Sequence, residues 1–245
     1  MQSFTCQNCG ATVEAKFCGQ CGQKKQERIT LGQVGDDVYS GLIDFESPFL
    51  KTLYFLTVNP SKVYVEYLDG ARKRYFSPVR YSIWIMTLMI AIAAMTDTVI
   101  VDLSQLESNA PELETQLARF QAIINSLLIP LYFASACLTA GFLRFVFRNE
   151  KYTFAELFYP ALLNISHFCL VYCIAILLGV FQNAWSQLLL TVLSVVYMCW
   201  GLTGIFRPVS GKKYLKSFIA IVLGLAVYML AFAFLSFSIG YFSLL

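Results

Sequence analysis

The sequence predicts an all-α polytopic membrane protein of about five transmembrane helices, preceded by a small N-terminal zinc ribbon and interfacial amphipathic helices. Hydrophobic residues make up 58% of the 245 residues and charged residues only 13%, whereas a soluble domain carries about 25% charge. Near the start, four cysteines form two Cys-x-x-Cys-Gly sequences. We therefore expect a ribbon over residues 1–28, a linker with interfacial helices over 29–78, and a five-helix bundle over 79–245.

The ribbon is predicted from Cys6-Gln-Asn-Cys9-Gly and Cys18-Gly-Gln-Cys21-Gly. Each sequence turns two thiolates toward one point, and the glycine after the second cysteine allows the tight backbone that thiolate ligation favours. We expect these four cysteines to hold one structural Zn²⁺ in a closed tetrahedral site. Disulfides within the knuckles and a rubredoxin-like iron site are the alternatives. Zinc is preferred because the topology below places this end in a reducing compartment.

Two short helices are expected before the first span. Residues 30–47 read as a linker and a short helix with one apolar stripe, and residues 48–69 are split by Asn59-Pro60. Pro60 in a first helical turn would start a helix from Ser61 to Leu68, ended by Gly70. These pieces are too short and too polar to span a bilayer, so we expect them to lie at the membrane interface.

Five apolar segments reach the ~20 residues that a span needs. They cover about 79–96, 122–143, 157–181, 184–206 and 217–243. The loop after the first is acidic, whereas the segment before it and the loops after the second and fourth are basic. Because positive residues stay on the cytoplasmic side, we expect the N-terminus inside and the C-terminus outside. The first thirty residues lack a continuous apolar stretch, so no secretory signal peptide is expected there.

Small residues at helical spacing occur in three of the spans. They are the pairs Ala136 and Ala140, Ala220 and Gly224, and Gly201 and Gly204. Such pairs let two helices approach closely, so packing is the preferred interpretation.

The stretch from Pro60 to Pro78 resembles a bacterial membrane family of unknown function, domain of unknown function 3667. The matching residues are Pro60, Val63, Tyr67, Leu68, Gly70, Arg72, Tyr75 and Pro78. Members of that family show a Cys-x-x-Cys-Gly pair, this segment and then several membrane spans. The resemblance implies the same architecture and a bacterial inner-membrane location, and it implies no activity.

The same stretch carries a basic cluster. An interfacial helix that ends at Gly70 would present Arg72, Lys73 and Arg74 at the height of the lipid headgroups, with Tyr75 as an interfacial anchor. These charges either fix the orientation of the protein or bind a headgroup or partner specifically.

Polar residues within the spans are the remaining candidates. No Asp, Glu, Lys or Arg lies in the middle of a span, which weakens an ion-coupled transporter. His167 lies in mid-span, and Asn164 precedes it on the same helical face. With Asn125, these residues would line a cavity; the alternative is hydrogen bonding to a neighbouring helix.

Function is the least determined property. The sequence has no Gly-x-Ser-x-Gly, His-Glu-x-x-His or Walker loop, so an enzyme is not expected. The ribbon has no basic stripe, so no nucleic acid is expected. The first hypothesis is an inner-membrane interaction or regulatory protein whose ribbon docks a protein partner. The alternative is a permease or lipid-handling protein with a cavity near Asn164 and His167. In both hypotheses membrane lipid surrounds the bundle.

Overall fold

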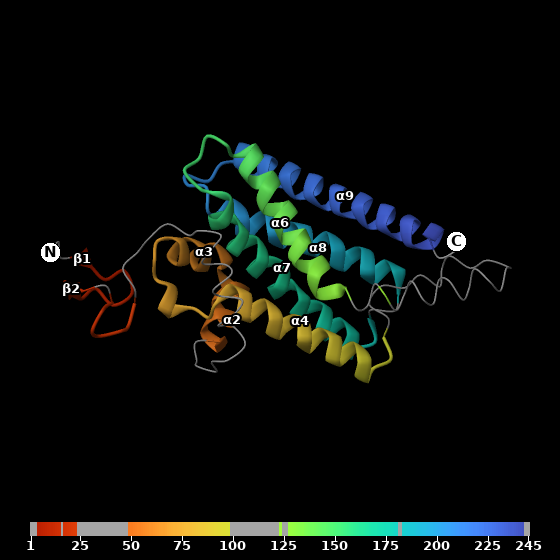
Figure 1. Cartoon of the computed structure of the whole chain (residues 1–245), viewed down its shortest axis with the longest axis horizontal. Helices are drawn as coiled ribbons and strands as arrows, with labels where there is room; N and C mark the ends of the chain where they lie inside the picture. The colour runs from red at the N-terminus through yellow and green to blue at the C-terminus, as the bar shows by residue number, and fades with distance from the viewer. Residues whose placement is uncertain are drawn as a thin grey trace.

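A small two-stranded ribbon precedes a helical body (Figure 1). The computed structural model describes residues 4–15, 17–23, 49–98, 123, 127–180 and 183–242. The ribbon strands are β1 (Phe4–Thr5) and β2 (Thr12–Val13), paired antiparallel. The helices are α2 (Phe49–Val58), α3 (Pro60–Leu68), α4 (Pro78–Met95), α6 (Leu128–Val146), α7 (Phe154–Leu177), α8 (Ala184–Thr203) and α9 (Gly211–Phe242). A short 3-10 turn, η1 (Arg72–Arg74), joins α3 to α4.

Helices α4, α6, α7, α8 and α9 are each long and apolar enough to cross a membrane. The expectation of a mostly helical chain with five such helices is therefore confirmed for the residues that the structure describes. Helix α9 begins at Gly211, before the apolar segment expected from about residue 217. Hydropathy marks where a chain becomes apolar, and lysine is itself a good helix former. The helix therefore starts in the basic loop, ahead of the apolar run.

The central element is α7, which packs against α4, α6 and α8 and also against α2 and α3. About 67% of its most apolar window is buried, against 22–44% for the other four spanning helices. Its start is fixed by a capping box, in which Glu156 N–H donates to Thr153 Oγ1 and Thr153 N–H donates to the Glu156 carboxylate. Pro160 lies inside this helix without ending it.

Helices α2 and α3 form a hairpin that packs against the bundle. As expected, Asn59-Pro60 separates them: Asn59 Oδ1 accepts a hydrogen bond from Lys62 N–H, and Pro60 opens α3. Ser61 Oγ donates to Gly201 O at 3.0 Å. A Cβ atom on Gly204 would collide with the Ser61 side chain. The close approach expected at this glycine pair is thus to the short helix α3, and at Gly201 also to Asn164 of the long helix α7.

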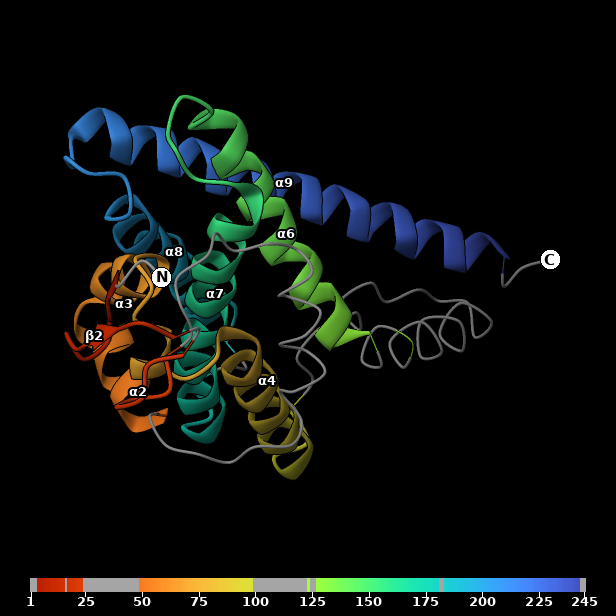
Figure 2. The same ribbon diagram turned by 60° about the vertical axis from the view of Figure 1, so that its left-hand side comes forward.

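The other small-residue pairs pack α6 against α9. Ala136, Ala140 and Ala220 are fully buried, and a Cβ on Gly224 would lie 3.4 Å from Thr139 Cα. Close packing at these positions is confirmed. In Figures 1 and 2 the ribbon lies at the end of the body where α2 and α3 are found.

Candidate metal centre and buried polar cluster

The two knuckles of the ribbon have the same backbone hydrogen bonds. In the first, Cys6 N–H donates to Ala11 O and Gly10 N–H donates to Cys6 O, each at 2.8 Å. In the second, Cys18 N–H donates to Gln23 O and Gly22 N–H donates to Cys18 O, also at 2.8 Å. Gly10 and Gly22 have φ of 78° and 70°, a left-handed conformation that favours glycine. The glycines were therefore correctly identified as parts of the knuckles.

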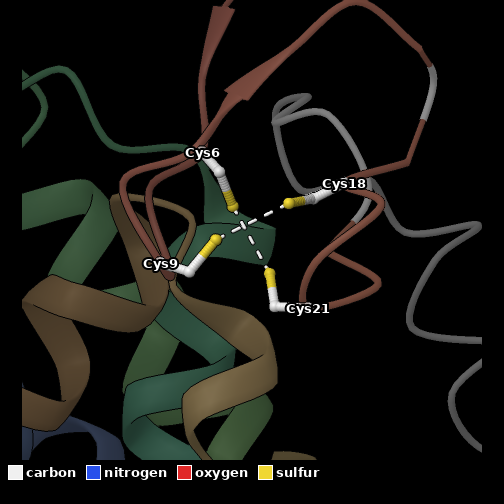
Figure 3. Close-up of side chains that lie close together, drawn as sticks. All are labelled: Cys6, Cys9, Cys18 and Cys21. Atoms are coloured by element: carbon white, nitrogen blue, oxygen red, sulfur yellow. Dashed lines mark hydrogen bonds between the residues drawn. The ribbon is translucent and has the colours of Figure 1, made fainter.

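The knuckles bring four sulfur atoms together (Figure 3). The Sγ atoms of the four knuckle cysteines all lie within 4.8 Å of one another. Cys6 Sγ lies 3.5 Å from Cys21 Sγ, and Cys9 Sγ lies 3.6 Å from Cys18 Sγ. A tetrahedral zinc with Zn–S bonds of ~2.3 Å requires sulfurs about 3.8 Å apart. The donor set and its spacing therefore fit one tetrahedral metal ion.

The same distances test the two alternatives to zinc, which are disulfides within the knuckles and an iron site. A disulfide needs sulfurs about 2.05 Å apart, and the short contacts run between knuckles, not within them. All four cysteines are free thiols in this structure. Four sulfur ligands suit either zinc or iron, so the geometry supports a metal ion without identifying which one.

Electrostatics in the cluster also favour a cation. A hydrogen bond from the Asn8 side chain is the largest influence that lowers the pKa of Cys21, to about 6. At Cys9 the backbone hydrogen bond at Ala11 lowers the pKa, but burial and the neighbouring thiols outweigh it and raise the pKa to about 12. One thiol thus ionises readily while another resists a second nearby charge. A cation among the sulfurs removes that resistance.

The basic turn η1 is held on both sides. Arg74 Nη1 and Tyr75 OH both donate to Glu66 Oε2, at 2.8 and 2.7 Å. On the other side, Lys73 N–H donates to Gln23 Oε1 of the ribbon at 3.0 Å. Tyr75 is buried, at 3% exposure. The structure therefore places Tyr75 and Arg74 in a polar contact within the protein, where the sequence predicts an interfacial anchor and a headgroup contact.

His167 bridges α7 to two other helices. Thr57 Oγ1 lies 3.1 Å from His167 Nε2, and Tyr81 OH lies 2.7 Å from Nδ1. Because the Thr57 hydroxyl donates to Leu53 O, it accepts from Nε2, so Nε2 carries the proton and Nδ1 accepts from Tyr81. Both ring nitrogens are thus paired, with α2 and with α4.

Asn164 lies close by in a different environment. It is fully buried, and its Nδ2 lies 2.6 Å from where a Cβ of Gly201 would be. Among the residues that the structure describes, neither polar atom of the Asn164 side chain makes a hydrogen bond of good geometry, although the Tyr64 hydroxyl lies close enough to interact with it. Burial raises the pKa of Tyr64 well above its ordinary value, and Tyr197 adds to the rise. The third expected cavity residue, Asn125, lies outside the described residues.

Sequence reasoning did not identify the residues that hold these sites in place, namely Gln23, Thr57, Glu66 and Tyr81. Their partners lie in distant segments, as in the bond between Gln23 and Lys73. Glu66 alone carried a local signal, because Lys62 precedes it by one helical turn.

Comparisons with known proteins find one family. Residues 46–90 match the model of a family described as "Protein of unknown function (DUF3667)". This segment contains α2, α3, η1 and most of α4, and it includes all eight residues on which the sequence resemblance is based. No curated protein matches the chain, and no solved structure does.

Proposed function

We propose that the chain is an interaction or regulatory protein of the bacterial inner membrane, with a cytoplasmic zinc ribbon that docks a protein partner and a five-helix bundle that anchors it. The observation that carries the proposal is the group of four thiols within 4.8 Å of one another. A four-sulfur site leaves no open position for a substrate, which favours a structural role for the metal. The proposal includes no catalytic step.

The charge pattern supports the orientation. Basic residues gather before α4, around the connection of α6 to α7, and from Arg207 into the first turns of α9, whereas the segment after α4 is acidic. The positive-inside rule places these basic segments and the ribbon in the cytoplasm and the C-terminus outside. A reducing cytoplasm keeps thiols available for zinc.

The ribbon has a surface suited to a partner. Phe17 is 55% exposed and follows the hairpin that carries the first knuckle. An exposed aromatic ring is a common anchor in protein interfaces. Docking through Phe17 would leave the metal ligands themselves untouched.

The test begins with the purified full-length protein, its bound metal and its co-purifying proteins. We expect one zinc per chain. Cys9→Ser should lose the metal while the protein still inserts in the membrane, and Phe17→Ala should keep the metal but lose a partner that the unmodified protein retains. Cys137→Ser is the matched control, because Cys137 is exposed on α6, far from the ribbon in sequence. Identical co-purifying proteins from all four proteins would contradict the docking role.

A second candidate function is a permease or lipid-handling protein, favoured by the fully buried amide of Asn164, which makes no hydrogen bond of good geometry to the described residues around it. A buried amide without a partner costs about 1–3 kcal/mol, and a bound polar molecule would offset that cost. Asn164→Leu separates the possibilities. If the amide holds no ligand, this change should leave the free energy of unfolding unchanged or raise it by about 1 kcal/mol. If it holds a ligand, the co-purifying lipid or small molecule should be lost.

A further inference from the structure

The second knuckle of the ribbon touches the turn that leads into α4. Gln23 is 6% exposed, and its Oε1 accepts a hydrogen bond from Lys73 N–H. Beside it, Gly22 lies against the Lys73 side chain, since a Cβ on Gly22 would be 3.9 Å from Lys73 Cε. The two residues that end the knuckle thus contact a segment 50 positions away in the chain.

The amide that Gln23 accepts from would otherwise lack an internal partner. In the 3-10 turn η1, Arg74 N–H donates to Ala71 O, and the amides at the start of such a turn have no acceptor within it. Ala71, at the cap position, provides no side-chain hydrogen bond. Gln23 supplies that acceptor from the ribbon.

The position of Gln23 depends on the metal site. Gln23 O accepts from Cys18 N–H, the bond that closes the second knuckle. The ribbon has a very small core, formed by Cys6, Val13 and Cys18 with three partly buried neighbours. A module of this size is usually unfolded without its metal. The Gln23 side chain is therefore held at the turn while the knuckle is closed around a metal ion.

Opposite charges also favour the contact between the metal-loaded knuckle and the turn. Four thiolates around one divalent zinc carry a net charge of −2, and the turn contributes the cations of Arg72, Lys73 and Arg74. Glu66 already holds Arg74 from the other side. The metal-loaded knuckle thus lies beside a basic turn whose charges complement its own.

We infer that the Gly22–Gln23 edge of the second knuckle is an intramolecular docking surface for the Arg72–Arg74 turn, and that metal loading of the ribbon keeps the turn docked at the start of α4. This inference rests on the metal centre of the proposed function and goes beyond it. In this inference the ribbon binds a segment of its own chain, the turn that leads into α4. A partner that docks at Phe17 would then bind a ribbon whose second knuckle is already engaged at Gly22 and Gln23.

The knuckles supply an internal comparison. Ala11 occupies the position in the first knuckle that Gln23 occupies in the second, since each provides the carbonyl that accepts from the first cysteine. An alanine at this position is therefore compatible with a closed knuckle. We expect Gln23→Ala to keep the metal while it removes the bond to Lys73.

The experiment is hydrogen–deuterium exchange of the Lys73 amide in the full-length protein in detergent, with bound zinc measured on each sample. Gln23→Ala should retain one zinc and exchange about two- to tenfold faster at Lys73, the range that one hydrogen bond provides. Gln20→Ala is the matched control, because Gln20 is an exposed glutamine in the same knuckle, and it should exchange at the unmodified rate. The Phe76 amide, which donates to Thr52 Oγ1, is the internal reference.

Removal of zinc from the unmodified protein with a chelator should reproduce the faster exchange at Lys73. The docking inference would be overturned if the Lys73 amide exchanged at the unmodified rate both in zinc-loaded Gln23→Ala protein and in unmodified protein after chelation. The metal centre would still stand in that case. If Gln23→Ala lost the metal, the chelator experiment alone would decide, with unchanged exchange again overturning the inference. A full-length protein that binds no zinc would overturn the proposed metal centre itself, a result distinguished by the metal measurement.

Discussion

At the scale of single residues, Glu66 links the segments around the basic turn. Its carboxylate accepts from Tyr75 and from Arg74, and Lys62 lies 4.0 Å away. Burial raises the pKa of Glu66, but these hydrogen bonds and positive charges outweigh it, so the pKa is lowered from its ordinary value of 4.5. A carboxyl whose pKa is lowered by folding stabilises the protein above its unfolded pKa, and that stabilisation disappears as the pH falls through the folded pKa.

Replacing Glu66→Gln therefore tests this contact with a defined pH dependence. At pH 7 we expect the free energy of unfolding in detergent to fall by about 1–2 kcal/mol, because two hydrogen bonds lose their charged acceptor. Below the pKa of Glu66 the two proteins should become equally stable. Glu14→Gln, at an exposed ribbon position, should change little at either pH. A difference between the Glu66 proteins that persists in acid would show that the charge is not responsible.

Single residues also show the limit of sequence reasoning about sites. The four cysteines of the candidate metal centre could be found from sequence because each knuckle encodes its geometry locally, in two cysteines, a fixed spacing and a glycine. The environment of His167 could not be found from sequence, because its hydrogen-bond partners lie on α2 and α4 and are determined by how these helices pack. The choice between a cavity and helix-to-helix hydrogen bonds therefore needed coordinates, and at His167 both ring nitrogens are paired between helices.

At the scale of elements, α3 and α8 approach closely because two glycines lie on one face of α8. At Gly204 any side chain would meet Ser61, and at Gly201 it would meet Asn164 and Pro60. The pattern of small residues predicts close packing, but it does not name the partner. The partners are the nine-residue helix α3 and, at Gly201, also the long helix α7, which carries Asn164.

Gly204→Ala is expected to push α3 away from α8. Overpacking of this kind costs about 1–3 kcal/mol, so the free energy of unfolding in detergent should fall by that amount. Gly211→Ala is the control, since no atom lies within 4 Å of a Cβ placed there; it should change stability by less than about 0.5 kcal/mol. Equal stability of the two variants would show that α3 can shift at no cost.

At the scale of the whole molecule, the sequence predicts the number of spanning helices well and their arrangement poorly. Length and hydropathy identify each span from its own residues. The central position of α7 depends on how five apolar surfaces pack together, and mean hydropathy barely distinguishes a helix surrounded by protein from one surrounded by lipid. Large apolar side chains remain exposed along α8, among them Trp185 and Leu189, and along α9, among them Met229 and Leu230. These faces are suited to lipid.

The central position of α7 also has a consequence for how the chain is made. The partners of two of its polar side chains belong to segments synthesised earlier: Thr57 and Tyr81 for His167, and Ser82 for Ser166, with the two Oγ atoms 2.7 Å apart. When α7 leaves the ribosome, those helices are already present, so its histidine and serine need not wait in lipid for a partner. The N-terminal half of the chain thus carries the hydrogen-bond partners for α7, the helix that becomes the centre of the bundle.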